Sequence, residues 1–568
     1  MPKVKNTLPG FLWAHAAQLV VLAALIYCIT QAFDPPRLNW GDQNSDYNIM
    51  TSGENFARVG FVALRFTPVV LSPHYHPGDG PPAFYTHYPP LPDLANGLWR
   101  VLFGLTELPE FRLVALAFSF GALGFFHPLV KHYWSKPVAD LALVLWVLNP
   151  LWLQHADYLH HYPYCWFFGF GCLYWLHRYL ESSRKLFAAL SCGFLFLTYM
   201  ASYDYWFFVP LLVALMTWRQ VGSWRSRRFW GIVSVIGAGA VLALATKFGL
   251  AMWALGGWDA AKQDLVFQFH ERATDRYSHT GFKAGAMTTI VLRIYRFYTP
   301  VFGPVLVFAC IFPILNRLFF RKYGVDGALY RHNPALLFLV ALPFVFCFME
   351  LFVGQYYPTL QLLPAYTVLS ATFVVWMLQF RKRLTRIATA ACLLLIAAHV
   401  GVELTVLKKA FISYPAIASL RKELDAATPP GRVVLTNHDF GGLYRYYLDR
   451  PIYGVILLTP EVFTRALVDH TDGPVVFVEH KDIEAQLFDK THYIIFARFN
   501  QWEWFGDPVK YRHIIAAEIN MQNQLLMEAV GKVGKKISDH EEYALWLIPQ
   551  YQPLPPPKLL HPEKAESK

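Results

Sequence analysis

Apolar runs alternate with short polar segments along the first 406 residues of the chain, and each run is about long enough to cross a bilayer. A membrane's hydrocarbon core takes roughly 20 apolar residues when they form a helix. The pattern predicts a mainly α membrane protein with about eleven transmembrane helices. The runs lie near 11–33, 111–130, 137–153, 161–177, 186–202, 204–218, 230–254, 298–316, 334–353, 357–379 and 385–406.

Lysine and arginine gather before the first run and after every second run. If the N-terminus is cytoplasmic, all of these clusters lie on the cytoplasmic side, as the positive-inside rule expects. The first run has no obvious small-residue cleavage site, which predicts a helix that is retained. The clusters are Lys3 and Lys5; Lys131 and Lys136; Arg178, Arg184 and Lys185; Arg219, Arg225, Arg227 and Arg228; Arg317, Arg321, Lys322 and Arg331; and Arg381, Lys382, Arg383 and Arg386.

This topology places three segments outside the cytoplasm: a loop at 34–110, a loop near 255–297, and the chain after about residue 409. We therefore divide the chain into a transmembrane domain (1–408), an extracytoplasmic α/β domain (409–550) and a Pro-rich, disordered tail (551–568). The α/β prediction rests on strands expected at 432–437, 474–480 and 491–498, with helices at 460–470 and 508–533.

Composition supports a membrane protein and argues against both a nucleic-acid-binding protein and a cysteine-based disulfide or zinc protein. The chain is 55% hydrophobic and only 16% charged, with a mean hydropathy of +0.30. The net charge of +11 does not indicate nucleic-acid binding, because the cations sit between apolar runs. None of the seven cysteines has C-x-x-C spacing, so neither a disulfide framework nor a zinc–cysteine site is expected.

The first outer loop opens with "NWGDQNSDYNIM", in which Asp42 and Asp46 are one helical turn apart and Tyr47 follows. One interpretation is a helix start, with Asp42 as the N-cap and Asp46 as a first-turn acid. The other is a general base at the mouth of a lipid-facing cavity.

A second polar cluster, His155, Asp157, His160 and His161, lies in the turn between the third and fourth runs. Its spacing matches no common zinc site. It is either a polar interfacial turn or a functional site; Asp157 is the best functional candidate, since an acid at the membrane edge is costly.

Two further segments offer phosphate contacts. Arg272 and Arg276, on the outer side, break the positive-inside trend and suit either an anionic partner or lipid headgroups. Tyr356 and Tyr357 could hydrogen-bond a phosphate or anchor the chain in the aromatic belt of the membrane.

Together these motifs resemble the GT-C glycosyltransferases, in particular the branch of the protein mannosyltransferases and the lipid A aminoarabinose transferases. "GDQNSDY" is similar to the acidic first-loop motif, "HYPPLPD" to a Lys-Pro-Pro-Leu motif, Asp157 to a second acid, and "QYYPTLQLLP" to a late Tyr-x-x-x-Pro element. The sequence departs from the family at Tyr88, where the family has Lys, with His87 beside it. It lacks the Asp-x-Asp of the metal-dependent oligosaccharyltransferases.

The resemblance implies an inverting transfer of a sugar from a polyprenyl-phosphate donor to a glycan, lipid or protein hydroxyl, at the outer face of the cytoplasmic membrane. It implies Asp42 as the base, Asp157 and Asp46 as orienting acids, and no cofactor, with a divalent metal left as an alternative. Other classes that the residues leave open are a transporter or flippase of a lipid-linked saccharide, and a sensor. The implied substrate-binding residues are Tyr47, His87, Tyr88, His155, Arg272, Arg276, Tyr356 and Tyr357.

Overall fold

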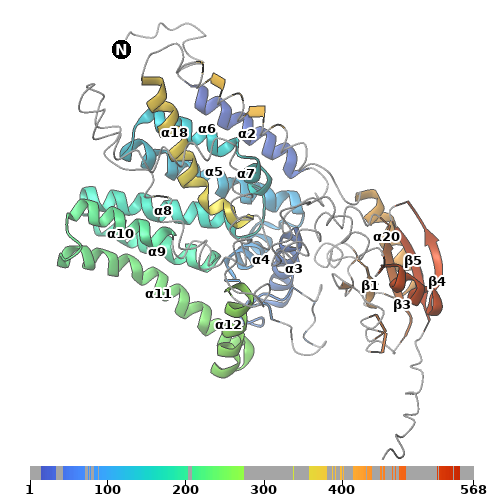
Figure 1. Cartoon of the computed structure of the whole chain (residues 1–568). Coiled ribbons are helices and arrows are strands. Elements are labelled where there is room, and N and C mark those ends of the chain that lie inside the picture. The colour runs from blue at the N-terminus through green and yellow to red at the C-terminus, as the bar shows by residue number, and fades with distance from the viewer. Residues whose placement is uncertain are drawn as a thin grey trace, which may run out of the picture. The chain divides into compact units, whose positions relative to one another are not determined.

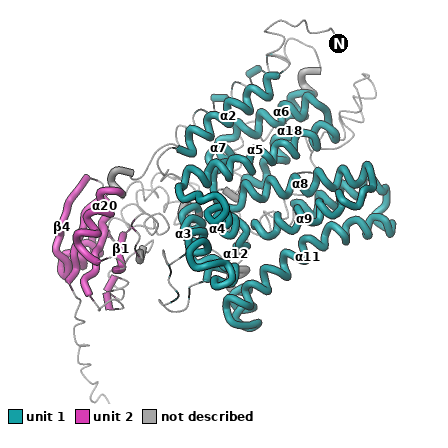
Figure 2. The backbone as a smooth tube through the Cα atoms, turned by 180° about the vertical axis from the view of Figure 1, so that it is seen from behind, with its two compact units in different colours: residues 1–70, 74–410, 496–502 teal, residues 71–73, 411–495, 503–568 magenta. Residues whose placement is uncertain are grey.

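The computed structural model describes, with short gaps, residues 15–33, 43–70, 75–202, 208–273, 357–379, 414–437, 448–481 and 521–549, plus isolated residues elsewhere. The chain divides into two compact units (Figure 2). Unit 1 comprises residues 1–70, 74–410 and 496–502, and unit 2 comprises residues 71–73, 411–495 and 503–568.

Unit 1 is helical wherever the structure describes regular elements longer than a single bridge. Its helices are α2 (Ala16–Ala32), α3 (Gln43–Val59), α4 (Leu91–Phe103), α5 (Leu108–Tyr133), α6 (Lys136–Val147), α7 (Pro150–His155), α8 (His161–Ser182), α9 (Lys185–Ala201), α10 (Phe208–Val221), α11 (Arg227–Leu255), α12 (Trp258–Ala273), the 3-10 helix η3 (Tyr357–Leu362) and α18 (Leu363–Gln379).

Two of these helices, α5 and α11, are long and apolar enough to span a membrane by length and composition. Shorter apolar helices form at Ala16–Ala32, Lys185–Ala201, Phe208–Val221 and Leu360–Val375, each within or overlapping an expected run. The runs at 298–316 and 334–353, and most of 385–406, lie outside the described residues. The expected count of about eleven spans therefore stays a prediction.

The expected run at 137–153 is not one helix. It divides into α6 and α7, because the side chain of Asn149 accepts a hydrogen bond from the Trp152 N–H (3.0 Å) and so caps a new helix. Pro150 occupies the first turn of that helix, where a missing N–H costs little. The break turns the chain just before Asp157, so it helps to place the polar cluster of residues 155–161.

The core of unit 1 is aromatic. α5 packs against α6 and α8, α8 packs against α9, and α9 packs against α11 (Figure 1). Trp146, Trp152 and Trp166 are fully buried where α6, α7 and α8 meet. Burial of these large indole rings removes a large apolar area from contact with water. This packing stabilises the ends of the helices that carry the candidate site.

The first outer loop contains a tight crossing of α3 and α4. A Cβ added at Gly53 would lie 1.9 Å from Asn96 Oδ1, and one at Gly97 would lie 2.7 Å from Phe56 Cβ. Both positions therefore require glycine for the helices to approach. Asn55 reinforces the loop, because its amide donates to the Val69 carbonyl (3.0 Å) and its Oδ1 accepts from the Tyr75 N–H (3.0 Å).

Unit 2 contains a five-stranded mixed sheet in the order β2-β1-β3-β5-β4. β1 (Val434–Thr436) pairs in parallel with β2 (Ile452–Gly454) and β3 (Val475–His480), whereas β5 (Tyr543–Ile548) pairs antiparallel with β3 and β4 (Lys535–Asp539). β1 and β3 fall where strands are expected. The expected strand at 491–498 lies outside the described residues, and β2, β4 and β5 are additional to the sequence prediction.

Helix α20 (Tyr414–Ala427) belongs to the same unit and ends at a buried arginine. The Arg450 guanidinium donates to the carbonyls of Leu424 (3.1 Å) and Thr428 (2.7 Å), and to the Asp425 carboxylate (3.0 Å). A cation at this position satisfies the last carbonyls of the helix and complements its dipole. The expected tail at 551–568 lies outside the described residues.

Candidate active site

Asp46 stands in the first turn of α3, where the sequence predicts an acid, yet it does more than begin its own helix. Its side chain is 1% exposed, and Oδ1 accepts a hydrogen bond from the Leu159 backbone N–H at 2.8 Å. This bond joins the first outer loop to the turn at residues 155–160, which is 113 residues away in the chain. Tyr47 beside it is buried as well.

Asp157 and Arg112 complete the charged cluster. Asp157 is 2% exposed and Arg112, in the first turns of α5, is 4% exposed. The Arg112 guanidinium interacts electrostatically with the carboxylates of Asp157 and Asp46, and with Tyr47 and Tyr158. Opposite charges near a buried guanidinium offset part of the cost of burying it. The cluster thus holds two acids from different segments around one arginine.

A small pocket is lined by residues close in the chain to this cluster, although Asp46, Asp157 and Arg112 are not among its lining residues. Its wall includes Asn48 and Ile49 of α3, Tyr88, and the imidazoles of His160 and His161. The Tyr88 ring stacks on His161 (centroids 5.5 Å, 17°) and meets His160 edge-on (5.0 Å, 80°). The pocket therefore brings Tyr88 into contact with two histidines.

Asp93 also lines the pocket, from the first turn of α4. Burial raises the pKa of its carboxyl to about 7, and the nearby Ser52 side chain opposes part of that rise. A carboxyl that titrates near neutrality in a pocket is suited to donating or accepting a proton. Asp93 thus adds a third acid to the site.

The structure brings together only some of the residues that the sequence nominates. Asp46, Tyr47 and Asp157 meet in one cluster, and Tyr88 lines the small pocket. His155 is buried in the same turn, where its Nδ1 lies 2.8 Å from the Leu151 carbonyl oxygen; it is not among the residues that line the pocket. Tyr357 begins η3. Asp42, His87, Arg276, Tyr356 and the side chains of Arg272 and Tyr357 lie outside the described residues.

Sequence reasoning missed Arg112, Asp93 and the role of His160 and His161. Arg112 could have been found, because a cation four residues into an apolar helix is costly unless it has a partner. Asp93 looks like an ordinary first-turn acid after three prolines, and its burial follows only from the crossing of α3 and α4. His160 and His161 were seen in the polar turn, but their contact with Tyr88 depends on the fold.

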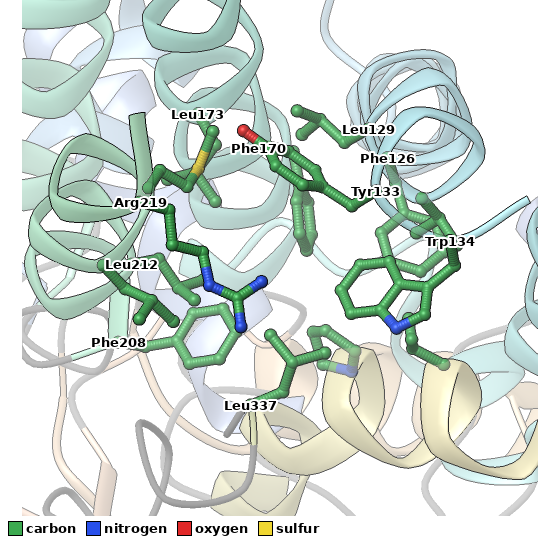
Figure 3. Close-up of a pocket in the computed structure, with 15 residues that line it drawn as sticks. Phe126, Leu129, Tyr133, Trp134, Phe170, Leu173, Phe208, Leu212, Arg219 and Leu337 are labelled. Carbon is green, nitrogen blue, oxygen red and sulfur yellow. The ribbon is translucent and has the colours of Figure 1, made fainter. Parts of the chain in front are cut away.

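A second pocket of unit 1 is apolar and lies at the opposite end of α5. It has about 630 Å³ of empty space, among α5, α8, α10 and α18. The Arg219 guanidinium and the Trp134 indole stand on opposite sides of it (Figure 3). Tyr133 in its wall is 21 residues from Arg112, about 30 Å along the helix. This pocket is therefore separate from the carboxylate cluster.

Comparison with known proteins gives structural matches alone: no family model and no curated protein matches the sequence. The crystal structure of ArnT from Cupriavidus metallidurans bound to undecaprenyl phosphate aligns with a TM-score of 0.54 at 13% identity, over 93% of this chain and 97% of that chain. Its apo form gives 0.51 at 12% identity, over 94% and 98%. The Archaeoglobus fulgidus oligosaccharyltransferase in complex with Zn and sulfate gives 0.51 at 15%, over 84% and 70%.

The chain has the fold of ArnT and of the oligosaccharyltransferase. Both ArnT and the oligosaccharyltransferase are GT-C proteins, and the alignment extends over most of this chain. The resemblance inferred from the motifs is therefore confirmed at the level of fold. GT-C proteins span the membrane several times, which agrees with the apolar helices of unit 1. Identity this low carries the fold and not the reaction, so the reaction has to be argued from the site.

Proposed function

We propose that the protein is a membrane glycosyltransferase that moves a sugar from a polyprenyl-phosphate donor to an acceptor hydroxyl. The observation that carries the proposal is the buried cluster of Asp46, Asp157 and Arg112, built from two segments of a GT-C fold, together with the pocket lined by Tyr88, His160 and His161. The undecaprenyl phosphate bound to the similar ArnT supports a donor of this chemical class.

In the proposed reaction, the acceptor hydroxyl oxygen attacks the anomeric carbon, and the bond from that carbon to the phosphate oxygen breaks. The polyprenyl phosphate leaves as a stable anion, and an aspartate takes the hydroxyl proton. Asp42 remains the base that the motif predicts. Asp46 and Asp157, which interact electrostatically with Arg112, orient the sugar or the acceptor; either could serve as the base in place of Asp42. Attack opposite the leaving group inverts the anomeric centre.

The phosphate needs donors, because the family's Lys is replaced by Tyr88. His160 and His161 contact Tyr88 at the pocket wall, and a protonated imidazole can provide the charge that a lysine would. The two imidazoles are proposed as phosphate donors alongside His87, which the resemblance implies as a substrate-binding residue. Stabilising the charge that develops on the leaving phosphate lowers the barrier. Arg272, Arg276 and the tyrosines at 356 and 357 remain proposed as further contacts.

The proposed setting is the outer face of a cytoplasmic membrane, with the N-terminus inside and unit 2 outside. The Lys and Arg clusters support this orientation. The carboxylate cluster agrees with it, because Arg112 lies at the start of α5, at the end opposite the Lys131 and Lys136 cluster. Transfer itself is proposed to need no metal.

The test is native mass spectrometry of the detergent-purified chain with undecaprenyl phosphate, followed by a transfer assay. The assay supplies undecaprenyl-phosphate monosaccharides and an acceptor extract from the membranes of the source cell. We expect wild type to bind the lipid and to release it from a sugar conjugate. Asp46→Asn and Asp157→Asn should bind the lipid but lose about 100-fold or more in turnover. His160→Ala/His161→Ala should bind it more weakly.

Asp140→Asn is the matched control. Asp140 is a carboxylate that pairs with His127 and Lys136 between α5 and α6, away from the pocket. It should bind and turn over like wild type. A wild-type chain that binds bulk phospholipid but not undecaprenyl phosphate would overturn the proposal, as would Asp46→Asn/Asp157→Asn turning over at the wild-type rate.

A further inference from the structure

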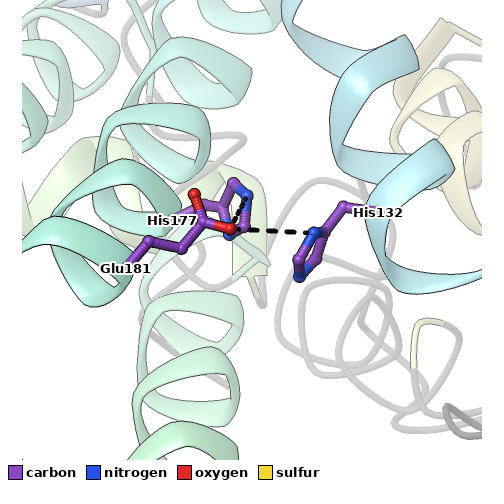
Figure 4. Close-up of side chains that lie close together, drawn as sticks. All are labelled: His132, His177 and Glu181. Atoms are coloured by element: carbon purple, nitrogen blue, oxygen red, sulfur yellow. Dashed lines mark ion pairs between the residues drawn. The ribbon is translucent and has the colours of Figure 1, made fainter.

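Three metal-ligating side chains meet at the far ends of α5 and α8 (Figure 4). His132 comes from the last turn of α5, and His177 and Glu181 come from one face of α8, four residues apart. One ligand atom of each lies within 4.8 Å of the other two. The cluster is built from two helices, so it is not an accident of neighbouring residues along one segment.

The distances suit a single divalent ion. His177 Nε2 is 3.5 Å and His132 Nδ1 is 3.9 Å from the same carboxylate oxygen, Glu181 Oε1. Tetrahedral zinc at about 2.0–2.1 Å from nitrogen and oxygen places its ligand atoms roughly 3.3 Å apart. Small rotations of His132 and Glu181, whose side chains are 48% and 43% exposed, would close the difference.

The residues around Glu181 favour its carboxylate as a metal ligand. The other oxygen of Glu181, Oε2, lies 3.6 Å from Arg178 Nη1, which leaves Oε1 toward the two imidazoles. This contact is an ion pair rather than a hydrogen bond, and an outer partner that orients a ligating carboxylate is common at metal sites. The His177 side chain is only 10% exposed, so it provides a fixed anchor, whereas its two partners leave a solvent path for the ion.

We propose that His132, His177 and Glu181 bind one zinc-class divalent cation, with water in the fourth position. The ion would join α5 to α8 about 30 Å from Arg112, counted as 20 residues along α5. These are the two helices whose other ends carry Arg112 and His161, so the ion would fix the pair without contacting the substrate. This site is distinct from the proposed transfer site and does not depend on the proposed function.

The test uses the full chain purified without a polyhistidine tag, stripped with chelator and titrated with Zn²⁺ against a competing indicator. We expect one zinc per chain in wild type, and at least about tenfold weaker binding in His177→Gln and in Glu181→Gln. Zn²⁺ should raise the Tm of wild type and not that of the variants. His127→Gln, a histidine of α5 paired with Asp140, is the matched control and should bind like wild type.

The proposal would be overturned if His177→Gln/Glu181→Gln bound zinc as tightly as wild type. It would also be overturned if folded wild type bound no zinc in the titration. Should a variant fail to fold, the visible spectrum of wild type loaded with Co²⁺ decides alone. Intense bands typical of tetrahedral cobalt support the site, and the weak bands of six-coordinate cobalt contradict it. The transfer assay plays no part in either readout.

Discussion

Arg112 in unit 1 and Arg450 in unit 2 are both buried arginines, and they are held in opposite ways. The terminal amino groups of Arg450 donate to backbone carbonyls at the end of α20 and to side chains there. In the described part of the chain, Arg112 Nε and Nη1 donate no hydrogen bond, and its charge faces the carboxylates of Asp46 and Asp157. Arg450 thus closes the end of one helix with hydrogen bonds to neighbouring residues, whereas Arg112 connects electrostatically two acids from distant segments.

The largest expected effect is the loss of turnover when Arg112 of unit 1 is replaced. Arg112→Met should lower the turnover of the proposed transfer by about 100-fold or more, because it removes the cation that interacts with the two carboxylates and positions them. Arg112→Lys should retain part of the turnover, since it keeps the charge without the planar fork. The measurement is release of undecaprenyl phosphate from the sugar donor. Wild-type turnover in Arg112→Met would remove Arg112 from the site.

Asp93 differs from Asp46 and Asp157, because among the described residues no cation offsets the burial of its carboxyl. Its pKa of about 7 lies above the ordinary value of 3.8, so Asp93 favours the fold most below pH 3.8 and progressively less as the pH rises through 7. At pH 8 we expect Asp93→Asn to be more stable than wild type, by at most about 4 kcal/mol. Thermal unfolding between pH 4 and pH 8 checks this.

The control for Asp93 is the exposed Asp259 of α12. Asp259→Asn should leave the pH profile of the Tm unchanged. If Asp93→Asn and wild type lose stability in parallel between pH 4 and pH 8, then Asp93 is not the group that titrates.

The smallest expected effect lies in unit 2. Arg450→Met should lower the free energy of unfolding of unit 2 by about 2 kcal/mol, because carbonyls of α20 lose their donor. Limited proteolysis of the chain measures it, and the exposed Arg421→Met is the control. Binding of undecaprenyl phosphate should be unchanged. If Arg450→Met lost as much lipid binding as His160→Ala/His161→Ala, Arg450 would no longer be a purely structural arginine in contrast to Arg112.

The sequence by itself determined the helical class of unit 1, the helix that begins before Asp46, and the two aspartates of the candidate site. Apolar periodicity and span length are local properties of the chain, so they can be read without coordinates. Strand β4 of unit 2 was missed because it is polar and largely exposed, so its sequence has no strong alternation of apolar and polar residues. Only its pairing with β5 defines it as a strand.

Only the tertiary structure decided which polar residues meet. It joined Asp46 to Leu159 across 113 residues, set Arg112 between two acids, placed Tyr88 on His161, and buried Asp93 against Ser52. It also brought His132 to His177 and Glu181. Such contacts depend on how helices far apart in the chain cross, and the crossings depend on side-chain packing, such as the fit of Gly53 against Asn96. A sequence shows which side chains are available, but packing between distant segments decides which of them act together.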